Sequence, residues 1–216
     1  HFQDLQSLQA IGTTWMNGFS RLGIDNSKRP TAEQLTAVAK RYTGFTFLQT
    51  GENIIMEQIE WYSMIADHKM PMTNFVRTPA ELHYCDEPDY WHDVMGHIPY
   101  LVIPEYVEMY TLLARTYVSA FQNNRKDLLP QLDFIGGLLI ELGLIREPSG
   151  IKAFGATFYS SSEVFEAYKK ENQIIFSPEA LFSGESYDRH HFQGKYYIID
   201  SFNQLRNIIV DLNRQC

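Results

Sequence analysis

The chain has 216 residues, 44% of them hydrophobic, which suits one domain with a substantial core. Its 18 lysines and arginines against 26 aspartates and glutamates leave a formal charge of −8, so a protein that binds nucleic acid through its phosphates is excluded. The sequence has neither an uncharged apolar run of about 18 residues nor the features of a signal peptide, so we expect no membrane partner and no secretion.

Helical patterns dominate the chain, and short strand patterns interrupt them. The first clear helix begins with a capping box, Thr31 followed by Gln34, and continues until Gly44. A strand is expected over 44–48, helices over 54–68, 105–122, 128–144 and 161–170, strands over 152–156 and 195–199, and a last helix over 201–212. No repeat or linker divides these elements. The sequence therefore predicts one domain over 1–216, mainly α with a small β element.

Two histidines stand five residues apart in the segment 87–99. On an ideal α-helix this spacing turns His92 and His97 about 140° away from each other. Gly96 and Pro99 indicate that a helix ends here, and a C-terminal turn would bring His97 back toward His92. The pattern is not the HExxH motif of zinc proteases. Either the pair binds a metal, or both are ordinary core or surface histidines.

A third candidate ligand is Glu141, which lies in the almost wholly apolar segment 134–145. A buried, ionised carboxylate costs several kcal/mol or more unless a cation is beside it. Two imidazoles and one carboxylate form the facial arrangement that suits non-haem Fe(II) and O₂ activation. The same three groups also suit zinc with a bound water, and sequence spacing does not separate the two metals.

Several motifs in register resemble one protein family. They are Asp86-Glu87-Pro88-Asp89, His92-Asp93, Gly96-His97-Ile98-Pro99, Glu141-Leu142-Gly143-Leu144, the segment 151–156 with Ser160-Ser161, and the segment 197–202. Their order and spacing resemble the pterin-dependent aromatic amino acid hydroxylases, and the segment 70–79 resembles the bacterial phenylalanine 4-hydroxylase branch. The resemblance covers residues 43–202 and implies the catalytic-domain fold of that family.

The resemblance implies a non-haem Fe(II) monooxygenase with iron on His92, His97 and Glu141. It further implies that O₂ and a tetrahydropterin, tetrahydrobiopterin or a related compound, are used to hydroxylate the ring of a free aromatic L-amino acid, with phenylalanine favoured. Arg77 matches the arginine that holds the substrate carboxylate, for which a guanidinium fork is the natural partner. The alternative for Arg77 is a structural salt bridge with an acidic residue of 81–89.

Three further residues acquire roles through the resemblance. Ser160 matches the serine that orients an iron-binding histidine, with a helix N-cap as its alternative. Trp61 occupies the position that stacks on the pterin ring, although it would also fit a core tryptophan beside Ile65. Asp93 stands where the family carries an acidic residue that reaches the pterin through water.

The clearest departure from the family is Gly136-Gly137, where typical members carry a Tyr-Trp pair. Position 137 lies one helical turn before the ligating glutamate and therefore borders the iron pocket. The favoured interpretation is a pocket enlarged by two missing aromatic side chains, so that the substrate, its seating or the oxidised ring position differs from typical members. A close helix crossing is the alternative. Cys85, Pro88 and Ser161 complete the predicted substrate-binding residues.

Two other functions remain open at this point: a zinc hydrolase on the same ligands with Asp93 as base, and a binding protein that has lost catalysis.

The two cysteines, Cys85 and Cys216, are too few for a disulfide framework and indicate a cytoplasmic protein. We expect a single catalytic domain without a regulatory domain. Because the chain ends without heptads, we also expect no tetramerisation domain, and therefore a monomer or dimer. His190 and His191 are expected to be an accidental surface pair.

Overall fold

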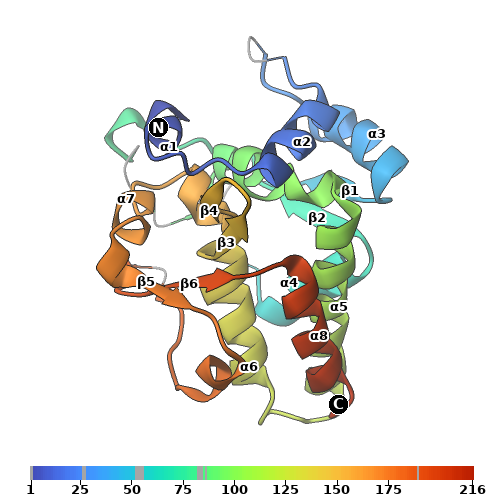
Figure 1. Cartoon of the computed structure of the whole chain (residues 1–216). Helices are drawn as coiled ribbons and strands as arrows, with labels where there is room; N and C mark the ends of the chain where they lie inside the picture. The colour runs from blue at the N-terminus through green and yellow to red at the C-terminus, as the bar shows by residue number, and fades with distance from the viewer. Residues whose placement is uncertain (1, 26–27, 52–55, 82–84, 86, 189) are drawn as a thin grey trace.

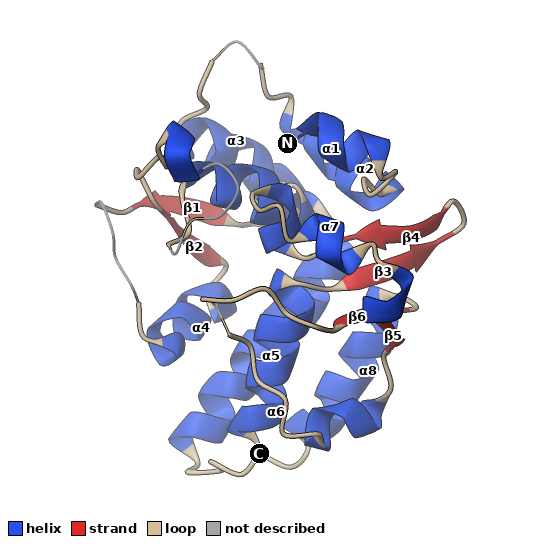
Figure 2. Ribbon diagram, turned by 90° about the vertical axis from the view of Figure 1, so that its left-hand side faces the viewer, coloured by secondary structure: helices blue, strands red, loops and turns tan. Residues whose placement is uncertain are grey.

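The computed structural model describes residues 2–25, 28–51, 56–81, 85, 87–188 and 190–216. Helices form most of the molecule, as Figure 2 shows, which confirms the predicted fold class. The α-helices are α1 (Phe2–Ser7), α2 (Thr13–Leu22), α3 (Ala32–Tyr42), α4 (Gln58–Ala66), α5 (Pro104–Gln122), α6 (Leu129–Phe134), α7 (Val164–Ala167) and α8 (Phe202–Asn213). The described residues also form two π-helical segments: η2 (His92–His97), which precedes α5, and η4 (Ile135–Glu141), which directly follows α6.

The strands form two small sheets. In the first, β1 (Thr46–Gln49) pairs in parallel with β2 (Lys69–Met72), and α4 connects the two. The second has the order β4-β3-β6-β5. Its strands are β3 (Leu144–Glu147), β4 (Gly150–Ala153), β5 (Gln173–Ile175) and β6 (Tyr196–Ile199). Strands β3 and β4 form an antiparallel hairpin, whereas β6 runs parallel to both β3 and β5.

The long helix α5 runs through the lower half of the molecule, with α8 beside it (Figure 1). Pro104 occupies the first turn of α5, where its fixed backbone angle suits a helix start. The buried rings of Tyr100, of Tyr106 on α5 and of Phe202 on α8 pack against one another. The aromatic core thus ties α5 and α8 to the segment that follows η2.

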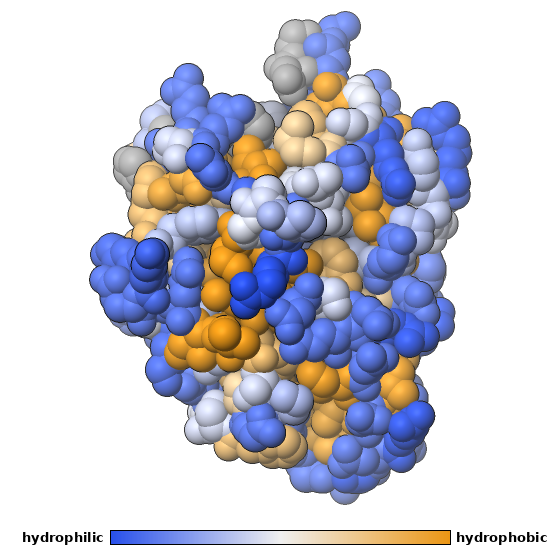
Figure 3. Space-filling view, viewed as in Figure 1, coloured by the Kyte–Doolittle hydropathy of each residue, from blue (hydrophilic) through white to orange (hydrophobic). Residues whose placement is uncertain are grey.

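Polar side chains cover most of the face seen in Figure 3, with apolar groups showing between them. Within the described parts of the chain, every helix falls short of the length and apolar character that a bilayer crossing needs.

Most predicted elements are present. The capping box forms as expected: the Thr31 hydroxyl accepts from the backbone N–H of Gln34, whose side chain accepts from the backbone of Thr31. Helix α8 begins at the Ser201 cap. The predicted strands 44–48, 152–156 and 195–199 correspond to β1, β4 and β6, with ends that differ by at most three residues.

Three helix predictions were too long. The helix expected over 54–68 starts at Gln58, and residue 54 lies outside the described residues. The helix expected over 128–144 ends at Glu141, because Leu144 already belongs to β3; an apolar run fits a buried helix or strand equally well. The helix expected over 161–170 shrinks to α7, since the Ser161 hydroxyl accepts from the N–H of Glu163 and competes with the helical pattern.

Candidate active site

Both histidines of the 87–99 segment lie on the single π-helical segment η2. The backbone N–H of Ile98 donates to the carbonyl of Asp93 at 3.0 Å, an i to i+5 bond. This wider turn places residues five apart above one another, so His92 and His97 face the same side. The helix ends at His97, as predicted, and the histidines do meet, but its last turn is π-helical and not α-helical.

Gly96 stands one residue before the end of η2 and also permits close packing. A Cβ at this position would lie 2.6 Å from the carbonyl oxygen of Ala156, nearer than real contacts allow. The absence of a side chain lets η2 settle directly on the 3₁₀ turn η5 (Ala156–Tyr159).

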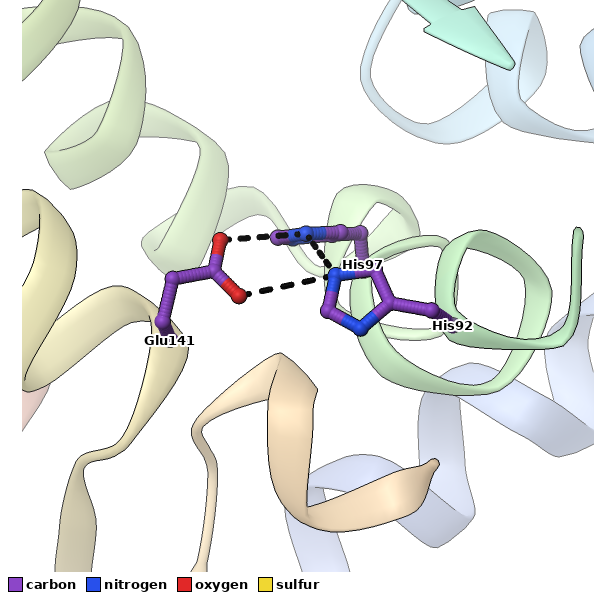
Figure 4. A group of neighbouring side chains, drawn as sticks. All are labelled: His92, His97 and Glu141. Carbon is purple, nitrogen blue, oxygen red and sulfur yellow. Dashed lines mark hydrogen bonds and ion pairs between the residues drawn. The ribbon is translucent and has the colours of Figure 1, made fainter. Parts of the chain in front are cut away.

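The third candidate ligand, Glu141, is the last residue of η4 and points at the two imidazoles (Figure 4). The Nε2 atoms of His92 and His97 are 3.1 Å apart. One Glu141 oxygen, Oε1, lies 3.3 Å from His97 Nε2, and the other, Oε2, lies 3.5 Å from His92 Nε2. Separations of this size are those between neighbouring ligands around one ion at about 2.1 Å. The three side chains fit a metal ion.

The electrostatics of the three groups favour a cation between them. Burial lowers the pKa of His92 to about 4, against the opposing charge of Glu141. Burial would raise the pKa of Glu141, but the charge and hydrogen bond of His97 outweigh it and lower the value to about 2. Burial also lowers the pKa of His97, yet the Glu141 carboxylate more than offsets this and raises it. A neutral imidazole and a carboxylate are donors that first-row metals prefer.

Hydrogen bonds from η5 and its following residue orient two of these groups. Ser160 Oγ lies 3.1 Å from His92 Nδ1, as predicted for a serine that orients a ligating histidine. Its alternative as an N-cap does not hold, because α7 begins only at Val164. The hydroxyl of Thr157 donates to Glu141 Oε2 at 3.1 Å. Sequence reasoning missed Thr157, since nothing in its neighbourhood marks it as facing Glu141.

Arg77 forms an ion pair with an acidic residue of 81–89, which was its alternative role, and it also lines the cavity. Its guanidinium pairs with the buried carboxylate of Asp89 at 2.8 Å and donates to the carbonyl of Ser160. Asp89 in turn accepts from the backbone N–H of His92 at 3.0 Å, which ties Arg77 to the start of η2. Among the described residues, the buried Nε–H of Arg77 has no hydrogen-bond partner. The guanidinium thus forms the structural salt bridge and also lines the cavity described next.

A cavity of about 590 Å³ opens onto the three candidate ligands. Seven other predicted site residues line it: Trp61, Arg77, Cys85, Pro88, Asp93, Ser160 and Ser161. Of the twelve residues predicted from the sequence, only Gly136 and Gly137 are absent from its lining.

The two residues predicted to contact the pterin, Trp61 and Asp93, both line this cavity. The half-buried indole of Trp61 donates to Tyr110 Oη at 3.0 Å, and its ring centre is 6.2 Å from that of His97. Asp93 is buried and accepts from the backbone N–H of Thr73 at 2.9 Å. Burial raises the pKa of Asp93 to about 7. Trp61 therefore packs against the core and lines the cavity at once.

The cavity is not enlarged at the double glycine, which corrects the favoured interpretation. A Cβ on Gly136 would overlap the hydroxyl of Tyr62, and a Cβ on Gly137 would overlap the side chain of Tyr187. The space left by the glycines is filled by side chains from elsewhere in the chain. Close packing, against Tyr62 of helix α4 and against Tyr187, is the physical reason for the pair.

The segment around Tyr187 forms a rim of the cavity that sequence reasoning missed. Tyr187, Asp188 and His190 all line the cavity, and His190 is exposed, as expected for a surface histidine. His191 is exposed and its ring pairs with Asp188 at 2.9 Å. No local motif marks this loop, because its residues reach the site only through the fold.

Glu163 anchors this rim through hydrogen bonds to residues that follow it in the chain. Its Oε1 atom accepts from the backbone N–H of Gln193 at 2.7 Å and from the hydroxyl of Tyr196 at 2.9 Å. The side chain is buried and lines the cavity, and burial raises its pKa despite the two hydrogen bonds.

Comparison with known proteins gives one consistent result. The family model described as biopterin-dependent aromatic amino acid hydroxylase matches residues 14–215. The phenylalanine-4-hydroxylase of Ralstonia nicotianae is 29% identical over 194 residues, which cover 88% of this chain and 60% of that protein. The chain therefore spans about three fifths of the length of this relative.

Solved structures agree with the sequence comparison. The cobalt-bound phenylalanine hydroxylase of Chromobacterium violaceum has a TM-score of 0.83 and 26% identity, covering 96% of this chain and 75% of its own. The phenylalanine hydroxylase of Legionella pneumophila also gives a TM-score of 0.83, with 25% identity and coverage of 99% and 94%.

Proposed function

The chain belongs to the biopterin-dependent aromatic amino acid hydroxylase family, and on this premise we propose that it hydroxylates the ring of a free aromatic L-amino acid, phenylalanine in the first place. The observation that carries the proposal is the convergence of His92, His97 and Glu141 in the cavity. Residues 1–216 act as one catalytic domain, with O₂ and a tetrahydropterin as co-substrates. One oxygen atom enters the ring, and two electrons from the tetrahydropterin reduce the other to water.

His92, His97 and Glu141 hold Fe(II) in this proposal. Three protein ligands leave open positions on the metal, which is the arrangement that non-haem iron enzymes use to activate O₂. The chain's own contribution is to keep His92 neutral and Glu141 ionised, whereas His97, whose pKa is raised by the Glu141 carboxylate, would release its proton when the metal binds. The lowered pKa values of His92 and Glu141 support these protonation states.

The amino acid substrate lies on the Arg77 side of the cavity. The Arg77 guanidinium, which lines the cavity, pairs with the substrate carboxylate in this proposal, while Asp89 holds the guanidinium plane in place. Cys85, Pro88 and Ser161 form the surrounding wall. Gly136 and Gly137 contribute to substrate selection indirectly, through the tyrosines that occupy the space beside them.

The tetrahydropterin lies against Trp61 and Asp93. The indole of Trp61 provides a flat π-face, and its Nε1–H bond to Tyr110 fixes the orientation of that face. Asp93 offers a buried carboxyl group whose raised pKa allows it to donate or accept a hydrogen bond near neutral pH.

The test is anaerobic loading of the protein with Fe(II), followed by O₂, tetrahydrobiopterin and each aromatic amino acid in turn. We expect pterin oxidation coupled to a hydroxylated amino acid, identified by mass spectrometry and NMR. The zinc-loaded protein is the matched control and should consume no O₂. Uptake of Fe(II) without turnover of any aromatic amino acid would overturn the proposed activity.

A further inference from the structure

One short segment lies between the two π-helical turns and contacts groups on both. The residues Thr157 and Ser160 are three apart at the 3₁₀ turn η5, where side chains at i and i+3 lie one above the other. Thr157 therefore faces Glu141, and Ser160 faces His92, from the same side of the turn.

The turn is held tightly against both ligand-bearing segments. The backbone N–H groups of Phe154 and Gly155 donate to the carbonyl of Gly143 at 3.0 and 2.9 Å. A Cβ on Gly155 would lie 2.5 Å from the carbonyl oxygen of Glu141, so the backbones are in direct contact there. On the other side, Gly96 brings η2 onto Ala156. The position of Thr157 relative to Glu141 is therefore set by backbone contacts.

Glu141 needs such a partner, because the last torsion of a glutamate side chain has no sharp preference. The side chain is also 23% exposed, so packing alone leaves its carboxylate free to turn. With Oε2 held by the Thr157 hydroxyl, Oε1 faces His97 and Oε2 faces His92.

We propose that Thr157 is a positioning residue for the metal site: its hydroxyl fixes the carboxylate of Glu141 so that both oxygens face the imidazoles. The inference rests on the metal site proposed above. It makes η5 a single support that orients one histidine ligand through Ser160 and the carboxylate ligand through Thr157.

The test measures metal affinity directly, with Co(II) as the probe because its absorption spectrum reports ligand geometry. Thr157→Val keeps the shape of the side chain and removes the hydroxyl, whereas Thr157→Ser keeps the hydroxyl. Thr111→Val is the matched control, since Thr111 is a buried threonine on α5 whose hydroxyl bonds the carbonyl of Val107.

We expect Thr157→Val to weaken Co(II) binding by about 10- to 100-fold and to change the Co(II) spectrum, as loss of a ligand's hydrogen-bond partner does elsewhere. Thr157→Ser should restore both, and Thr111→Val should alter neither. If valine prevents folding, Thr157→Ala removes the same bond and carries the same expectation. Unchanged affinity and spectrum in folded Thr157→Val would overturn the role of Thr157 but leave the proposed metal site and activity standing. Failure of the unsubstituted protein to bind Co(II) would overturn the metal site and, with it, both proposals.

Discussion

The two ends of the cavity are built differently. At the metal end, the side chains of His92, His97 and Glu141 are 8%, 3% and 23% exposed and stand on helical segments. At the rim, the lining comes from Cys85, Tyr187, Asp188 and His190, which lie outside the helices and strands. Rigid elements hold groups more precisely than loops do. Changes at the metal end should therefore remove activity, while changes at the rim should alter which substrate is used.

The largest effect should follow from neutralising Glu141. Glu141→Gln keeps the size of the side chain but removes the charge that lies between the two imidazoles. Since loss of a mere hydrogen-bonding partner of a ligand weakens metal binding about 10- to 100-fold, we expect loss of this ligand's charge to weaken it by more than about 100-fold. Metal content after dialysis and amino acid turnover measure the effect. Glu171→Gln, at an exposed glutamate, should change neither; a variant of Glu141 that retains its iron would contradict the ligand assignment.

Substitutions of Arg77 should give smaller effects, one on the stability of the fold and one on the binding of the amino acid. Arg77→Ala leaves the Asp89 carboxylate buried without its partner, so the free energy of unfolding should fall by about 3–5 kcal/mol. Arg77→Lys keeps the charge but not the planar fork. For the lysine variant we expect the KM for the amino acid to rise at least about tenfold with the KM for the pterin unchanged. Steady-state kinetics with each substrate varied in turn separates the two, and an unchanged KM for the amino acid would exclude Arg77 from substrate binding.

The rim can be tested through the contact of Gly137 with Tyr187. Gly137→Ala introduces a Cβ that overlaps Tyr187, and overpacking of this kind lowers stability by about 1–3 kcal/mol. If that contact is the cause, Tyr187→Ala in the same chain should recover most of the loss, with a coupling of about 0.5–3 kcal/mol. Denaturant unfolding of both single variants and the double variant measures it. We further expect the relative kcat/KM for phenylalanine, tyrosine and tryptophan to change; strict additivity in unfolding with unchanged selectivity would argue against a rim that selects the substrate.

The metal end could be predicted from the sequence because its signals are local. His92 and His97 share one short segment, and Glu141 stands out as an acid in an apolar run. The means by which the histidines meet was not predictable, because an i to i+5 turn depends on the packing of Gly96 against Ala156, about sixty positions away.

The rim was beyond sequence reasoning for the same physical reason. Tyr187 reaches Gly137 across fifty positions of chain, and no spacing rule connects them. The N-terminal end of α2 is a parallel case: the carboxylate of Glu147 accepts from the N–H groups of Thr13 and Thr14 at 2.7 and 3.2 Å, where a local cap would be sought. Helix α3, whose capping box lies in its own sequence, was predicted, whereas α2, which is capped from Glu147, was not.

The smallest effect should come from Glu163, which anchors the rim. Its pKa is raised by burial, so the folded protein favours the protonated side chain, and the stability gained from it is lost as the pH rises above the ordinary value near 4.5. Glu163→Gln keeps an oxygen that accepts from Gln193 and Tyr196 but does not ionise.

The difference in unfolding free energy, native protein minus Glu163→Gln, should therefore decrease between pH 4.5 and pH 8. Each unit by which the pKa is raised corresponds to about 1.4 kcal/mol, which sets the scale of the decrease. Urea unfolding with a chelator present at both pH values measures it, and Glu171→Gln corrects for the loss of one negative charge. A difference that increases with pH would show instead that the two hydrogen bonds stabilise the ionised carboxylate more than burial opposes it, and that the rim is anchored by a charge.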